Sequence, residues 1–146
     1  MPNDVGIRIG VDGEKEFRSS LSGINAQIRN LNSEMKTVVA SLTGMDDAEE
    51  ATARKMDVLG RSIDATRQKV AVISAEYDRA KSRLATLGAE LDTLQNAQDR
   101  DEQAIIRATR AYNEQARRVN DLGTQLNNAT TAMNRMEREL AEIASG

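Results

Sequence analysis

Large apolar residues recur every three and four positions along almost the whole chain, and they keep one phase. From Met56 to Ile143, 19 of the 22 Ile, Leu, Val, Met, Phe and Tyr residues lie on two series with a spacing of seven. Only Val58, Val72 and Ile106 fall outside these series. A period of 3.5 residues places a narrow apolar seam along one side of a helix, and another helix must cover that seam. The sequence therefore predicts an all-α protein made of long packed helices.

The seam is the candidate functional surface, because it is where helices of this chain would contact each other or a partner. The same spacing extends back into the first helix from Phe17. We define the helix-packing seam by 23 predicted residues: Phe17, Leu21, Ile24, Ile28, Leu31, Met56, Leu59, Ile63, Val70, Ile73, Tyr77, Leu84, Leu87, Leu91, Leu94, Ile105, Tyr112, Val119, Leu122, Leu126, Met133, Met136 and Leu140.

Composition argues against several kinds of site. The chain has no His and no Cys, which excludes His-based acid–base catalysis, thiolate chemistry, disulfides and the usual zinc sites. The net charge is −3, whereas a nucleic-acid-binding surface needs a concentrated excess of Lys and Arg. We therefore expect no enzyme, no catalytic or metal-binding residues, no cofactor, and neither a nucleic acid nor a small molecule as partner.

The sequence contains no run of 18 apolar residues and no signal peptide at its N-terminus. We therefore expect no membrane span in this chain, and a soluble product in the cytoplasm when it is made.

The first residues follow a different period. Val5, Ile7, Ile9 and Val11 alternate with small or polar residues, and a turn at residues 12–13 follows. This pattern predicts one short strand and turn over residues 1–13. A lone strand needs a partner, either from another subunit or from chain outside this sequence. The alternative is a frayed, glycine-weakened terminus.

Helix-capping signals divide the rest of the chain. Asp46 and Glu49 form an Asp-x-x-Glu capping box, and Asp99 and Glu102 repeat it 53 residues later. We predict a first helix over 14–43, a second over 47–97 and a third over 100–143, in a single coiled-coil domain.

Two topologies remain open. The heptad phase continues from Phe17 to Leu59 without a slip, as expected for one continuous coiled-coil rod. Small seam residues favour antiparallel hairpins instead, because an antiparallel pairing about residues 98–101 sets Ala80 against Val119 and Leu91 against Ala108. The hairpin is our prediction and the rod is the alternative.

Three glycines lie inside the predicted helices: Gly60, Gly88 and Gly123. Each costs about 1 kcal/mol against Ala in a helix interior. They either allow close helix approach or bending, or they are tolerated without a role.

The opening segment carries a family resemblance. Residues 5–17 contain Ile7, Ile9, Asp12-Gly13 and Phe17, and Ile24-Asn25 and the Leu-Asn-Ser-Glu-Met-Lys stretch of residues 31–36 follow. This order resembles the N-terminal region of tail tape measure proteins of long-tailed bacteriophages and prophages, which continue as long coiled coil. The specific part covers about the first 36 residues.

The resemblance implies a virion structural protein involved in tail assembly and tail length determination. Such proteins lie in several copies inside the tail tube, which implies self-association and contact with tube, tip or chaperone proteins. It also implies residence in the bacterial cytoplasm during assembly and then in the virion tail. Members are far longer, so we expect this chain to be an N-terminal fragment or a truncated prophage remnant. The alternative function is a coiled-coil oligomerisation or adaptor module unrelated to phage.

Overall fold

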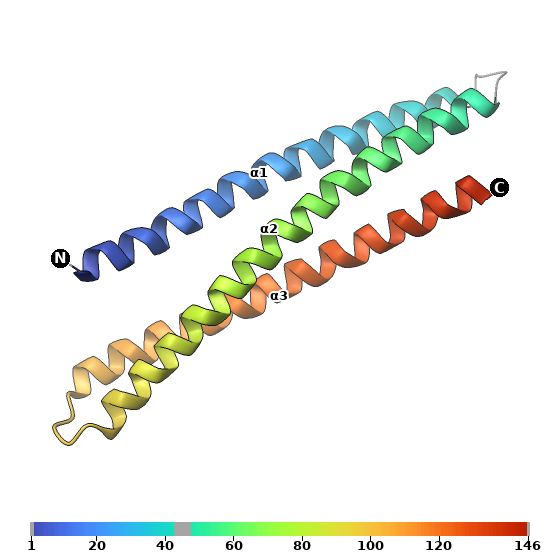
Figure 1. Ribbon diagram of the computed structural model, residues 1–146. Coiled ribbons are helices and arrows are strands. Elements are labelled where there is room, and N and C mark those ends of the chain that lie inside the picture. The colour runs from blue at the N-terminus through green and yellow to red at the C-terminus, as the bar shows by residue number, and fades with distance from the viewer. Residues whose placement is uncertain (1, 43–47, 146) are drawn as a thin grey trace. The chain divides into compact units, whose positions relative to one another are not determined.

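The computed structural model describes the backbone of residues 2–42 and 48–145 and the side chains of residues 13–41 and 49–145. This part of the chain forms three long helices, α1 (Pro2–Leu42), α2 (Ala48–Asn96) and α3 (Glu102–Ser145) (Figure 1). The prediction of an all-α protein built from long packed helices is confirmed. None of the helices in these ranges combines the length and the apolar character needed to cross a membrane.

The strand predicted at the N-terminus is wrong. Helix α1 begins at Pro2 and includes Val5, Ile7, Ile9 and Val11, and the described backbone contains no strand. A helix satisfies its own backbone hydrogen bonds, whereas a strand requires a second strand beside it. Among the described residues there is no second strand to pair with residues 5–11, and a helix needs none.

Apart from the start of α1, which lies at Pro2 and not at residue 14, the helix ends fall within two residues of the predicted positions. The cap of α3 needs a correction. Asp101 caps α3: its Oδ1 accepts hydrogen bonds from the amides of Gln103 and Ala104 at 3.1 and 3.2 Å. A carboxylate directly before the first helical residue reaches these two free amides. Asp99 was predicted for this role and lies two residues too early. The box predicted at Asp46 lies outside the described residues.

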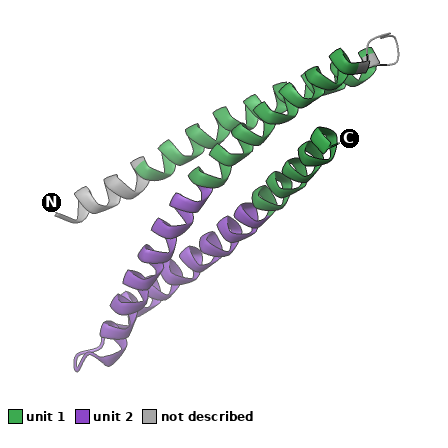
Figure 2. Cartoon of the chain, turned by 45° about the vertical axis from the view of Figure 1, so that its right-hand side comes forward, with its two compact units in different colours: residues 1–72, 128–146 green, residues 73–127 purple. Residues whose placement is uncertain are grey.

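The helices divide into two compact units, each described by itself (Figure 2). Unit 1 contains residues 1–72 and 128–146. In it, the first half of α2 packs against α1 and also against the last part of α3. The α1 contact includes Arg61 of α2 with Glu34, and the α3 contact includes Arg67 of α2 with Glu137.

Unit 2 contains residues 73–127, which are the second half of α2, the turn and the first part of α3. The two helices run antiparallel and form a hairpin (Figure 2). The side chain of Gln115 reaches the backbone of Ala80, and the Tyr112 ring lies against Gly88. The hairpin arrangement of the prediction is confirmed, and its turn lies at residues 97–101.

Candidate functional site

The structure places all 23 predicted seam residues in packed or half-packed surroundings. Eight are buried, namely Phe17, Ile24, Leu31, Leu59, Ile63, Ile73, Ile105 and Leu122. The other fifteen are half-buried, and none is exposed. By contrast, Ile106 lies outside the heptad series and is 51% exposed. The seam is therefore the contact surface between the helices of each unit.

Helix α2 has a second packed face in unit 1 that the two heptad series do not include. Ala51, Val58 and Ala65 are almost fully buried there, at 1%, 2% and 0% exposure. They lie seven residues apart, and the same spacing leads to Val72, which lines a groove together with residues of α1. A helix packed against two others needs two apolar stripes. The two α2 residues that broke the pattern, Val58 and Val72, were the signal for this second stripe.

Two tyrosines pack directly onto glycines of the opposite helix in unit 2. A Cβ added to Gly123 would lie 3.3 Å from Cε2 of Tyr77, and one added to Gly88 would lie 3.3 Å from Cε2 of Tyr112. Such a distance is tighter than ordinary van der Waals contact. Gly88 and Gly123 therefore allow close approach of the two helices, because a larger residue at either position would displace the tyrosine ring. Gly60 has open space instead.

These two contacts come from an internal repeat that the heptad analysis did not resolve. In each helix a tyrosine precedes a glycine by 11 residues, and the two copies are 35 residues apart. The repeated positions pair as Tyr77 with Tyr112, Arg83 with Arg118, Leu87 with Leu122 and Gly88 with Gly123. Because the helices are antiparallel, each tyrosine meets the glycine of the other copy. A self-comparison of the sequence at this interval would have found the pairs.

A buried carboxylate connects the two helices of unit 2. The Glu76 side chain is 6% exposed, and its Oε1 accepts a hydrogen bond from Nη2 of Arg118 at 2.9 Å. Its Oε2 accepts from Arg79, one turn further along α2, at 2.7 Å. Both carboxylate oxygens are thus paired with guanidinium groups, which a buried charge requires. Heptad reasoning did not find this pair because position 76 lies beside the seam.

A buried glutamine on one of the heptad series makes a hydrogen bond in the same unit. Gln115 is 8% exposed, and its Nε2 donates a hydrogen bond of 3.0 Å to the backbone oxygen of Ala80. Ala80 is itself buried, and its small side chain leaves the carbonyl accessible. The antiparallel arrangement therefore accommodates a glutamine that would meet another glutamine in a parallel pair.

An exposed ion network links α1 and α2 in unit 1. Arg61 donates two hydrogen bonds to the carboxylate of Glu34, one of them at 3.1 Å, and it also contacts Asp57 at 2.9 Å. The hydrogen bond from Arg61 lowers the pKa of Glu34 below its usual value. The hydrogen bonds that Arg61 donates to Glu34 and Asp57 raise the pKa of Arg61. The bidentate geometry orients α1 on α2 at this point.

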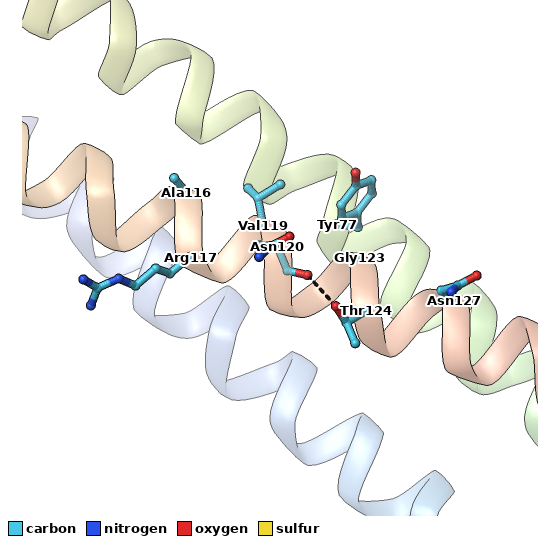
Figure 3. Close-up of a pocket in the computed structure, with 8 residues that line it drawn as sticks. All are labelled: Tyr77, Ala116, Arg117, Val119, Asn120, Gly123, Thr124 and Asn127. Carbon is cyan, nitrogen blue, oxygen red and sulfur yellow. Dashed lines mark hydrogen bonds between the residues drawn. The ribbon is translucent and has the colours of Figure 1, made fainter.

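The grooves between the helices are open. In unit 2, residues of α3 around Val119 and Gly123 line a groove together with Tyr77 of α2 (Figure 3). The hydroxyl of Thr124 at its edge donates to the carbonyl of Asn120 in the same helix, at 3.1 Å (Figure 3). In unit 1, Arg61 and Glu34 border a second groove, and these two charged residues pair with each other. Within the described part of the chain, no group of three or more carboxylates is arranged to hold a metal ion.

Comparison of the chain with protein-family models, with curated proteins and with solved structures gave no match.

Proposed function

We propose that this chain is a structural protein, the N-terminal coiled-coil part of a phage tail tape measure protein, with a role in tail assembly and tail length determination. The observation that supports a structural role is the burial of the seam. All 23 seam residues are buried or half-buried. Ion pairs beside the seam, such as Arg61 with Glu34 and Arg118 with Glu76, join neighbouring helices. The arrangement holds helices at fixed register, which is the work of a spacer or scaffold.

The phage assignment is supported by the resemblance over the first 36 residues. Phe17, Ile24 and Leu31 of the resembling segment are the buried residues by which α1 joins unit 1. The motif residues therefore serve helix packing in this chain. The second candidate, a coiled-coil oligomerisation or adaptor module unrelated to phage, is favoured by the same packing, since any protein that associates through helices would use it.

Tail particles offer a test. In a strain that produces tail particles, the codons for residues 73–128 are deleted from the gene that encodes this chain. This removes eight heptads and keeps the seam in phase on both sides of the deletion. The deletion should shorten the tail by about 84 Å if these residues lie there as one extended helix, and by about 42 Å if they keep the hairpin, at ~1.5 Å per residue. Tail length is measured by electron microscopy, and mass spectrometry of purified tails records whether the chain is present.

The matched control is Ile106→Ala, which changes an exposed residue and should leave tail length unchanged. Tails of normal length after the deletion, or purified tails without this chain, would contradict the tape measure assignment. Either result would leave the adaptor as the better proposal.

A further inference from the structure

The heptad phase passes through the turn between α2 and α3 without interruption. One seam series runs from Leu91 through Gln98 to Ile105, and the other from Leu94 through Asp101 to Ala108. The two helices of a hairpin do not need a common phase, because the turn lets each helix rotate to face the other. A common phase is needed only when both segments belong to one straight helix and face one partner.

The turn itself contains nothing that forbids a helix. Residues 97–101 include neither Gly nor Pro, and no residue with a positive φ occurs in the described backbone. The amide of Ile105 already donates to the carbonyl of Asp101 at 3.0 Å, which is the hydrogen bond of an α-helix. The cap formed by the Asp101 side chain is the local feature that separates α3 from α2.

The contacts between the two helices are centred on this turn. The residue numbers in the Tyr77–Gly123 pair add up to 200, and so do those in the Gly88–Tyr112 pair. The midpoint is residue 100. Two identical helices that cross antiparallel at residue 100 would set each tyrosine of one copy against the glycine of the other. The intramolecular contacts and the contacts between copies would then be the same.

We propose that the chain forms a dimer with a second copy of itself by exchanging α3, with residues 97–101 converted into continuous helix between α2 and α3. In this dimer Arg118 pairs with Glu76 of the other copy, and the Gln115 hydrogen bond to Ala80 is likewise made between copies. Gln98 of each copy lies opposite Asp101 of the other, so the polar centre of the seam can form hydrogen bonds. The partner is a second copy because only an identical chain supplies all of these contacts in register.

The exchange keeps the packed interface and loses only the turn, which is why such swaps are an accessible route to dimers. The balance between the two forms depends on protein concentration, since the dimer gains by mass action. The proposal is independent of the tail assignment: it concerns association of the purified chain, so either can fail without the other.

Light scattering after size-exclusion chromatography measures the mass across a range of concentrations. We expect species of 16.0 kDa and of twice that mass, with the larger one increasing with concentration. Because the chain has no cysteine, Thr93→Cys introduces one exposed site for a spin label. Residue 93 of one copy lies opposite residue 107 of the other, so the two labels in a dimer stand about 21 Å apart along the axis at ~1.5 Å per residue.

Two insertion variants, both between Asp99 and Arg100, distinguish the dimer formed by exchange of α3 from a dimer formed through any other surface. Seven helix-forming residues preserve the heptad phase, whereas five rotate α3 by ~140° relative to α2. A hairpin tolerates both, because its turn is exposed. We expect both variants to keep their helical circular dichroism, but only the seven-residue insertion to retain the dimer.

Asp101→Leu should increase the dimer fraction, because it removes the helix cap and places an apolar side chain at a polar position of the heptad series. The matched control is Arg107→Leu, at an exposed position beside the seam, which should leave the dimer fraction unchanged. The proposal is overturned if wild type and Asp101→Leu are monomers at every concentration. It is equally overturned if the dimer survives the five-residue insertion or lacks the ~21 Å distance between labels.

Discussion

The ring of Tyr77 on α2 lies so close to Gly123 on α3 that a Cβ on the glycine would stand 3.3 Å from Cε2 of the ring. The Gly88–Tyr112 contact repeats this relationship in the opposite direction along the hairpin. Two bulky rings thus lie over two residues without side chains. The helices can be that close because glycine has no side chain. The close approach comes with the lower helix propensity of glycine.

Gly60 and Gly123 should respond differently to the same substitution. Gly60→Ala meets no atom within 4 Å and should increase the free energy of unfolding by about 1 kcal/mol. Gly123→Ala must displace the Tyr77 ring, so we expect a smaller gain or a loss. Chemical denaturation of both variants provides the measurement. In a Tyr77→Ala background Gly123→Ala should recover the full gain, and equal effects in both backgrounds would show that the ring does not restrict this site.

Removal of Arg118 should destabilise unit 2 more than removal of an exposed arginine. Arg118→Ala leaves one oxygen of the buried Glu76 without its partner, while Arg79 keeps the other, so we expect a loss of about 1–3 kcal/mol. The control is Arg67→Ala, which breaks the exposed ion pair with Glu137 and should cost ~0–1 kcal/mol. Urea denaturation of the two variants is the measurement. Similar losses in both would mean that burial of Glu76 adds nothing to the pair.

Leu122 and Ile106 provide a direct test of the seam. Leu122 is 2% exposed and Ile106 is 51% exposed, although both lie on α3. Leu122→Ala should cost ~2–5 kcal/mol because it opens a cavity between the helices. Ile106→Ala should change stability by no more than ~0.5 kcal/mol. Comparable melting temperatures for the two variants would contradict packing at the seam.

The pairing of Glu34 with Arg61 should make stability depend on pH in the acid range. The hydrogen bond from Arg61 lowers the pKa of Glu34 in the folded chain below its unfolded value. The contribution is therefore complete above the unfolded pKa, and it is lost as the pH falls through the folded pKa, because the unfolded chain takes up the proton first. Glu34→Gln removes this titration. Thermal melts from neutral to acid pH should fall less steeply for Glu34→Gln than for wild type, and parallel curves would count against the pairing.

Much of the fold follows from local patterns in the sequence. The spacing of seven identified the three helices. Apart from the start of α1, their ends were predicted to within about two residues, the usual uncertainty of such boundaries. The N-terminal strand was mispredicted because alternation of apolar residues cannot report whether a second strand exists. The cap was assigned to Asp99 instead of Asp101 because both precede Glu102 and only the backbone geometry distinguishes them.

The sequence by itself determined that the chain is helical and which side of each helix is apolar, because both properties depend on neighbours within two turns. Only the tertiary structure decided which glycine meets which tyrosine, that Glu76 binds Arg118, and that Val58 belongs to a second packed face. These contacts join residues 24 or more positions apart, or depend on a third helix. Their energies depend on register and on the distance between helices, and neither of these is a property of any local segment.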